Sequence, residues 1–207
     1  MPKPQFSPTR SQLIFAMLAL LAALLFAGTG FYFSNLSHPG SSTGTALVGG
    51  PFTLTDHTGR KVTDKDYLGK YTLVFFGYTY CPDVCPTELQ VMSAALDSLG
   101  SKADAIQPIF VTIDPERDTP EVMKQYVLNF HPRLVGLTGT PEEIAAVAKA
   151  YRVYYSRVAN NSGPDAYLMD HSSIVYLMDR QGKFLKHFTY STDAAALAKA
   201  IEEVITP

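Results

Sequence analysis

The hydrophobic residues form one long uninterrupted run near the N-terminus and several shorter segments after it. Residues 13–33 hold 21 side chains without a charge, and a helix of that length spans roughly 30 Å, about the thickness of a bilayer core. Between residues 52 and 63 the apolar positions alternate around a turn at 57–59, which predicts a β-hairpin. The continuous apolar runs at 71–78 and 106–114 predict two strands that are buried on both faces.

Capping signals and periodicity predict helices and a second hairpin in the rest of the chain. Pro86 stands where a first helical residue is favoured, and Gly100 closes the helix that follows. Further elements are expected as helices at 118–130, 141–154 and 193–204 and as two strands at 172–190. The order of hairpin, strand, helix, strand, two helices, hairpin and helix predicts an α/β fold with a mixed sheet.

The charge pattern gives the long apolar run an orientation. Lys3 and Arg10 precede the run, and the next formal charge is Asp56. Because basic residues are retained on the cytoplasmic side, we expect a cytoplasmic segment at 1–12 and a single transmembrane helix at 13–33. A cleaved signal peptide is the alternative, but the run is long for one and lacks a clear small-x-small cleavage site. The sequence therefore predicts a single-pass protein of the bacterial inner membrane, with its soluble domain in the periplasm.

Composition divides the remainder into a linker and one domain. Residues 34–50 are rich in Gly, Ser and Thr without hydrophobic periodicity, which predicts a flexible tether. Residues 51–207 suit one globular domain of ordinary size. Without Lys3 and Arg10 the chain has 15 basic and 19 acidic residues, a net charge of −4. With no basic cluster, Gly-rich phosphate loop or internal repeat, the sequence does not indicate a nucleic-acid-binding protein.

The two cysteines of the chain stand at the end of the first predicted buried strand. They are Cys81 and Cys85, in C-P-D-V-C-P. In a near-helical loop, residues four apart share a face with Cβ atoms roughly 5–6 Å apart, a spacing that lets two sulfurs hold one ion or form a strained disulfide. A structural disulfide would stabilise little, because the closed loop is so short. The strand-end position, where α/β proteins place their sites, favours a functional pair.

One of the five histidines is placed to join the cysteines. His171 stands just before the predicted strand 172–178. If that strand is antiparallel to the strand 71–78, its start lies beside Cys81. The other histidines stand in the tether, in turns or on the polar face of the last hairpin, where solvent exposure is the simpler interpretation; they are His38, His57, His131 and His187.

Three segments together resemble the Sco (SenC) family of copper-handling, thioredoxin-like proteins. They are FGYTYCPDVCPTEL, FVTIDPERDTPEVMKQYV and YLMDHSSIVYLMDRQGKFL, and the similarity runs in the same order from about residue 54 to 205. The resemblance implies that residues 51–207 adopt a thioredoxin-like fold with an added N-terminal β-hairpin. It also implies a metal site at Cys81, Cys85 and His171.

The residue types agree with that site. Two thiolates and one imidazole are soft or borderline ligands that suit Cu(I) in a three-coordinate site, whereas a closed zinc site needs a fourth ligand. Asp83, Asp170 and Met169 stand near in sequence as supporting residues, although loop aspartates and methionines more often have no such role. The oxidation state stays open, with Cu(I) expected and Cu(II) as a second state.

The resemblance implies a membrane-anchored metallochaperone that delivers copper to the CuA centre in subunit II of cytochrome c oxidase. A periplasmic copper donor and a thioredoxin-like reductant would then be partners, since the cysteines must be reduced before Cu(I) binds.

The alternative is an enzyme, a thiol–disulfide oxidoreductase that uses Cys81 and Cys85 as a redox-active pair to reduce the acceptor's cysteines. Against it, CxxxC departs from the usual CxxC spacing and leaves His171 without a task. A peroxiredoxin-type peroxidase is disfavoured, because the threonine of that family's T-x-x-C-P-T-E segment is replaced by Pro82.

Overall fold

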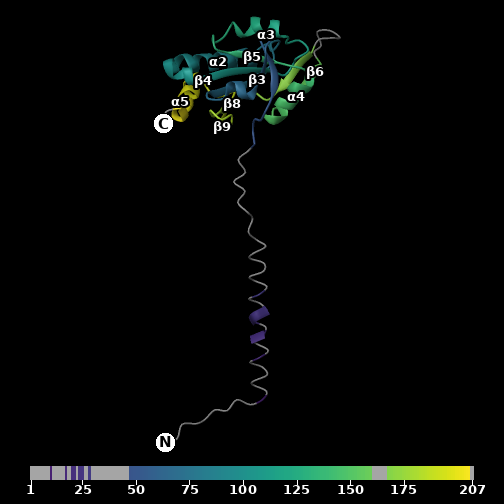
Figure 1. Ribbon diagram of the computed structural model, residues 1–207, viewed down its shortest axis with the longest axis vertical. Coiled ribbons are helices and arrows are strands. Elements are labelled where there is room, and N and C mark those ends of the chain that lie inside the picture. The colour runs from purple at the N-terminus through teal and green to yellow at the C-terminus, as the bar shows by residue number, and fades with distance from the viewer. Residues whose placement is uncertain are drawn as a thin grey trace. The chain divides into compact units, whose positions relative to one another are not determined.

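The computed structural model describes residues 47–159 and 167–205, together with isolated positions between residues 10 and 28 (Figure 1). The chain divides into two units, residues 1–45 and 46–207. Apart from the isolated positions, the predicted segments 1–12 and 13–33 and most of the tether lie outside the described residues. No helix in the described part is both long and apolar enough to cross a bilayer.

The second unit is built on a mixed sheet, as the sequence predicts. The sheet has seven strands, one more than predicted, because β5 was not expected. The strand order is β2-β1-β5-β4-β3-β8-β9. The central strands β5, β4 and β3 are parallel to one another. On either side of them, β1 is antiparallel to β5 and β8 is antiparallel to β3. The strand bounds are β1 Thr53–Asp56, β2 Lys61–Thr63, β3 Tyr71–Gly77, β4 Ile106–Thr112, β5 Val135–Thr138, β8 Ile174–Met178 and β9 Phe184–Thr189.

The predicted N-terminal hairpin is present and extends one edge of the sheet. Leu54 pairs with Val62 across β1 and β2, and β1 continues the sheet by pairing with β5. The turn is fixed by Asp56, whose Oδ1 accepts the backbone N–H groups of Thr58 at 2.9 Å and Arg60 at 3.0 Å. This hairpin is the expected addition to the thioredoxin-like fold.

The strand before the cysteines lies at the centre of the sheet, which explains its uninterrupted apolar run. β3 is parallel to β4 and antiparallel to β8, with Phe75 between Phe110 and Val175. From Thr72 to Gly77 every residue of β3 is buried. The expected antiparallel pairing of residues 172–178 with residues 71–78 is therefore confirmed.

The helices pack on the sheet close to their predicted positions. α2 packs against α5 (Figure 1), and α2 ends at Gly100, which has a φ of 56°. At the start, α2 begins two residues before Pro86, so that Cys85 lies in its first turn. The bounds are α2 Val84–Leu99, α3 Pro120–Val127, α4 Pro141–Ala150 and α5 Ala194–Ile205, with the 3-10 turns η1 Asp64–Tyr67 and η2 Gly100–Ala105.

Two further strands outside the seven-stranded sheet, which the sequence pattern also did not predict, change the setting of His171. β6 Tyr155–Ala159 and β7 Tyr167–His171 form a separate antiparallel pair. His171 is therefore the last residue of β7 and not part of a loop before β8. The pair has no fully buried residue, so it lacks the apolar signal from which strands are predicted.

Candidate metal centre

The two cysteines are held by the connection from β3 to α2. Cys81 is half-buried in the loop, and Cys85 is fully buried in the first turn of α2. The backbone N–H of Cys85 donates to Sγ of Cys81 at 3.3 Å. Free N–H groups at a helix start favour negative charge, so this turn stabilises a thiolate at Cys81.

Gly77, the last residue of β3, makes room for the buried sulfur. A Cβ atom at this position would lie 2.7 Å from Sγ of Cys85 and 2.9 Å from the ring of Phe110. Both distances are too short for any side chain, because buried atoms at this depth cannot move aside without repacking. The absence of a side chain at Gly77 therefore allows Cys85 to point at the end of the strand.

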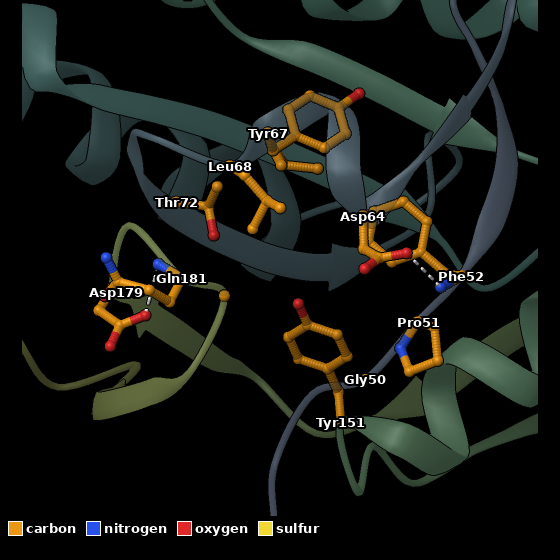
Figure 2. Close-up of a pocket in the computed structure, with 12 residues that line it drawn as sticks. Gly50, Pro51, Phe52, Asp64, Tyr67, Leu68, Thr72, Tyr151, Asp179 and Gln181 are labelled. Atoms are coloured by element: carbon orange, nitrogen blue, oxygen red, sulfur yellow. Dashed lines mark hydrogen bonds between the residues drawn. The ribbon is translucent and has the colours of Figure 1, made fainter.

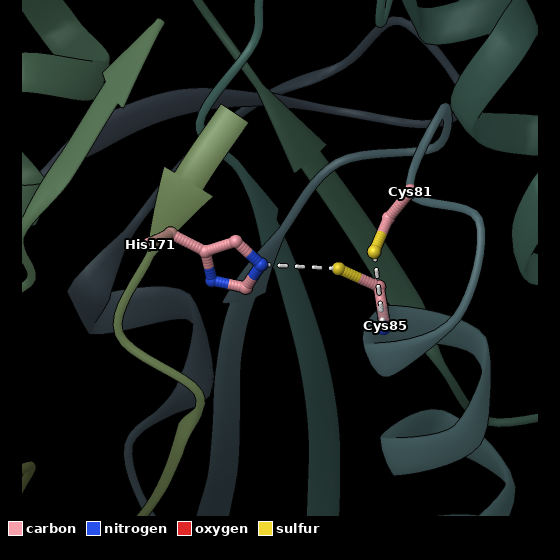
Figure 3. A group of neighbouring side chains, drawn as sticks. All are labelled: Cys81, Cys85 and His171. Carbon is pink, nitrogen blue, oxygen red and sulfur yellow. Dashed lines mark hydrogen bonds between the residues drawn. The ribbon is translucent and has the colours of Figure 1, made fainter. Parts of the chain in front are cut away.

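His171 reaches the cysteines from β7, as Figure 3 shows. Its Nε2 lies 3.3 Å from Sγ of Cys85, and the ligand atoms of Cys81, Cys85 and His171 all lie within 4.8 Å of one another. The imidazole stands edge-on to the rings of Phe75 and Tyr78, with centroids 6.2 Å and 6.0 Å away. The structure thus brings together all three predicted ligand residues.

The orientation of the imidazole suits metal binding through Nε2. Nδ1 lies 3.2 Å from the backbone carbonyl of Ser172. A carbonyl only accepts hydrogen bonds, so this contact places the ring proton on Nδ1 and leaves the lone pair of Nε2 facing the sulfurs. A second hydrogen bond of this kind is the usual means of orienting a histidine ligand.

The two sulfurs have different acid strengths. The hydrogen bond with Cys85 lowers the pKa of Cys81 to about 3, and the backbone N–H groups of Asp83 and Cys85 contribute further. The same bond, together with burial, raises the pKa of Cys85. Near neutral pH the pair therefore holds one proton, with a thiolate at Cys81 and a thiol at Cys85.

The donor set suits a soft ion in a site of low coordination number. Two sulfurs and one imidazole nitrogen match Cu(I). In the part of the chain that the structure describes, no carboxylate joins the cluster of three. Asp83 precedes α2 without a side-chain capping bond, Asp170 is exposed, and Met169 packs against the core.

Comparison with known proteins decides the family. A family model described as SCO1/SenC matches residues 40–206, which is most of the chain. The chain belongs to the SCO1/SenC family.

Relatives and solved structures agree with this Sco assignment. The chain is 48% identical to the human "Protein SCO1 homolog, mitochondrial" over 166 residues, covering 79% of this chain and 55% of the human protein. It is 43% identical to "Protein SenC" of Rhodobacter capsulatus over 162 residues, covering 78% and 72%. The structure of Bradyrhizobium japonicum ScoI with copper bound has a TM-score of 0.70 and 49% identity, covering 75% of this chain and 98% of that one. The chain thus spans little more than half the length of its human relative.

Asp118, which the sequence pattern predicts only as the start of a helix, connects parts of this Sco site. Asp118 is fully buried and accepts hydrogen bonds from the backbone N–H of Thr79 at 3.0 Å and from the hydroxyls of Thr79 and Thr112, each at 2.5 Å. It therefore holds the loop that carries Cys81 against the end of β4. Burial raises the pKa of Asp118, and the threonine hydrogen bonds oppose that shift.

Arg117, the neighbour of Asp118, holds the strand that carries His171. Its guanidinium lies 3.7 Å above the ring of Tyr167 and 4.7 Å from the ring of Tyr80, and Nη1 donates to the carbonyl of Tyr167 at 3.1 Å. The phenol of Tyr167 in turn donates to Asp114 at 2.8 Å. The signal was present in the sequence as D-P-E-R-D, but its role depends on contacts that sequence spacing does not reveal.

The remaining histidines that the structure describes lie away from the three-residue cluster. Nδ1 of His57 accepts the backbone N–H of Gly136 at 3.1 Å, and Nδ1 of His131 accepts that of Arg133 at 3.2 Å. His187 is exposed and stacks on Phe184. His57 and His131 thus have structural hydrogen bonds, although solvent exposure was the simpler expectation for them.

Proposed function

We propose that this Sco protein is a copper metallochaperone that holds one Cu(I) ion through Cys81, Cys85 and His171. The observation that carries the proposal is the meeting of three soft ligand atoms within 4.8 Å at a strand end. It is supported by the copper-bound structures of ScoI from Bradyrhizobium japonicum and from Arabidopsis thaliana, whose chains this one matches over 98% of their length.

The proposed cargo is delivered to the CuA centre of cytochrome c oxidase subunit II by exchange of ligands. Cys81 is half-buried at the rim, whereas Cys85 is fully buried. An incoming acceptor thiolate therefore reaches the Cys81 bond first, and Cys85 and His171 retain the ion until a second acceptor ligand binds. A copper donor and a thioredoxin-like reductant complete the cycle as further proposed partners.

An anaerobic Cu(I) titration of the reduced full-length chain tests the site. We expect one ion per chain and a loss of affinity of at least about 100-fold in His171→Ala, because a two-sulfur site loses both a ligand and its orientation. His187→Ala is the matched control, since that histidine is exposed on β9. Equal retention of copper by the His171→Ala variant and the parent would show that the three-ligand site is wrong.

The acid strengths give a second test of the same site. Cys81 is a thiolate at neutral pH and Cys85 a thiol, so loading at pH 7 should release about one proton per copper ion. The measurement is the heat of binding in buffers of different ionisation enthalpy. Release of two protons would contradict the shared-proton description of the pair.

Delivery is tested separately by mixing the loaded chain with the reduced, copper-free CuA domain of subunit II. We expect copper to move to the acceptor without passing through a chelator in the solution. If the Sco chain retained its copper in the presence of excess acceptor, the protein would store copper and would not deliver it.

The second candidate function is reduction of the acceptor's disulfide. It is favoured by one observation, the partly exposed Cys81 thiolate beside the protonated Cys85 thiol, an arrangement that also suits thiol–disulfide exchange. In that case the reduced chain would reduce an oxidised CuA domain at a rate that His171→Ala leaves unchanged. If the chain bound no copper but its cysteine pair was repeatedly reduced by thioredoxin, this function would replace the chaperone proposal.

The membrane anchor also belongs to the proposal. The apolar run at 13–33 and the preceding Lys3 and Arg10 support a single-pass protein with its domain in the periplasm. Protease treatment of spheroplasts tests this placement: the domain should be degraded, and the protein should stay with the membrane after carbonate extraction.

A further inference from the structure

A cavity lies at the end of β3 opposite to the metal centre (Figure 2). Its lining residues come from the segment 50–52, η1 and the residue after it, β3, β4, the residue after α4 and the β8–β9 turn. The polar and aromatic ones are Phe52, Asp64, Tyr67, Thr72, Tyr151, Asp179 and Gln181. Neither the family assignment nor the proposed copper function uses any of them.

The inner wall of the cavity carries two hydroxyl groups without partners. Tyr151 is 5% exposed and Thr72 7%, and Figure 2 shows both hydroxyls directed into the cavity. Within the described residues, neither hydroxyl makes a hydrogen bond, whereas the phenols of Tyr154 and Tyr167 do. Both oxygens face the open space of the cavity, and a hydroxyl group can accept as well as donate a hydrogen bond, so the two groups offer acceptors to a ligand that donates hydrogen bonds.

The rim of the cavity carries two carboxylates on opposite sides. Oδ1 of Asp64 accepts the backbone N–H of Phe52 at 3.2 Å, and Oδ1 of Asp179 accepts those of Gln181 and Lys183, each at 2.8 Å. The second oxygen of each carboxylate has no hydrogen-bond or ion-pair partner among the described residues. No lining residue is Lys, Arg or His, so the negative charge of the rim is not neutralised from within the cavity.

Aromatic rings complete the walls between the carboxylates. Phe52 and Tyr67 lie beside each other with centroids 6.2 Å apart, and the ring of Tyr151 forms the floor. Aromatic faces attract organic cations and do not coordinate metal ions. Calcium would require six to eight oxygen ligands, more than the two free carboxylate oxygens and two hydroxyls supply.

We propose that this cavity binds a primary ammonium group. Its three N–H donors would be shared by the free oxygen of Asp64 and the hydroxyls of Tyr151 and Thr72, while Asp179 adds negative charge at the mouth and the rings enclose the methylene next to the nitrogen. The ligand is either a free alkylamine or the lysine side chain of a protein partner. An anion is excluded by the two carboxylates, and a neutral apolar ligand would leave the hydroxyls unpaired.

Titration of the full-length chain with butylammonium, followed by NMR chemical shifts of the residues around the cavity, tests the proposal. We expect saturable shifts, an affinity loss of about tenfold in Asp64→Asn, because a charge-assisted hydrogen bond is lost, and of about fivefold in Tyr151→Phe. Tyr154→Phe is the matched control, since that phenol is 59% exposed. The unfolding midpoint of each variant shows that its fold is intact.

Two further probes identify the source and the chemistry of the ligand. Tighter binding of N-acetyl-lysine methylamide than of butylammonium would assign the cavity to a partner's lysine, and the reverse to a free amine. Equal binding of butanol, a stronger response to Ca²⁺, or no saturable shift at all would overturn the proposal. Copper titration of the same variants distinguishes the two sites. The copper affinity should be unchanged in these variants, whether or not the amine binds.

Discussion

The two ends of strand β3 carry sites of opposite chemistry. At Gly77 the groups are sulfur and imidazole, and they already pair with one another: Cys85 with Cys81, Cys85 with His171, and His171 with the carbonyl of Ser172. At Thr72 the groups are hydroxyls and carboxylates, and several have no partner among the described residues. The first end is a preorganised site for a soft ion, whereas the second has free acceptor oxygens that face an open cavity.

One buried strand thus carries a site for a soft ion at one end and, at the other, the proposed site for an ammonium group. Sulfur donors select Cu(I) and offer little to an ammonium group, and oxygen acceptors with aromatic walls do the reverse. The ligand affinity of each site should therefore change on substitution at its own end of β3 and stay the same on substitution at the other end.

The largest effect is expected from Gly77→Ala. The new Cβ would lie 2.7 Å from Sγ of Cys85, so it should lower the free energy of unfolding by about 3 kcal/mol. It should also weaken copper binding by more than about tenfold, because Sγ of Cys85 is displaced from its place beside His171. Chemical denaturation and Cu(I) titration measure the two effects. Butylammonium binding at the other end of β3 should persist in the folded fraction; its loss would mean that the two sites are coupled.

A pH-dependent effect of on the order of 2 kcal/mol is expected at Glu88. This residue is 2% exposed in α2, and burial raises its pKa from 4.5 to about 7. Because the folded state binds the proton more tightly, the stabilisation is complete below pH 4.5 and is lost as the pH rises through about 7. Glu88→Gln cannot ionise and should therefore lose less stability than the parent between pH 5 and 8.

Denaturation curves of both proteins across that range check the prediction. Parallel pH profiles for parent and variant would show that Glu88 does not contribute. Glu121→Gln is a suitable control, since Glu121 is an exposed carboxyl at the start of α3.

Asp118→Asn should have a smaller effect, about 1–2 kcal/mol on unfolding, because one acceptor oxygen is replaced by a donor facing the hydroxyls of Thr79 and Thr112. Its influence on the cysteine loop should appear as a change in the alkylation rate of Cys81. Asp104→Asn, at an exposed carboxylate, is the control. An unchanged alkylation rate with reduced stability would limit Asp118 to a structural role.

The smallest effect is expected from Tyr151→Phe, which removes an unpartnered hydroxyl and keeps the ring that packs on Phe76 and Tyr176. The free energy of unfolding should change by less than about 0.5 kcal/mol, and copper affinity should not change. A large loss of stability, measured by the same denaturation assay, would mean that the hydroxyl has a structural partner. It could then not be counted among the ligand-binding groups of the cavity.

Much of the fold could be predicted because its signals are local. The buried run at 71–78, the hairpin at 52–63 and the stop at Gly100 each depend on residues close in sequence, and all three are present. β6 and β7 were missed because their residues alternate between half-buried and exposed positions and have no apolar run. The strand β5 is only four residues long, too short for a periodic signal.

The ligand types of the candidate metal centre are visible in the sequence: two cysteines one helical turn apart after a buried strand, and a histidine. Their meeting depends on the tertiary structure, because 86 residues separate Cys85 from His171. The pairing of β3 with β8 and the position of β7 bring the two residues together. The cavity at the other end of β3 left no sequence signal at all. Its polar groups come from separate segments of the chain, and their common orientation toward one cavity is a property of packing and not of order along the chain.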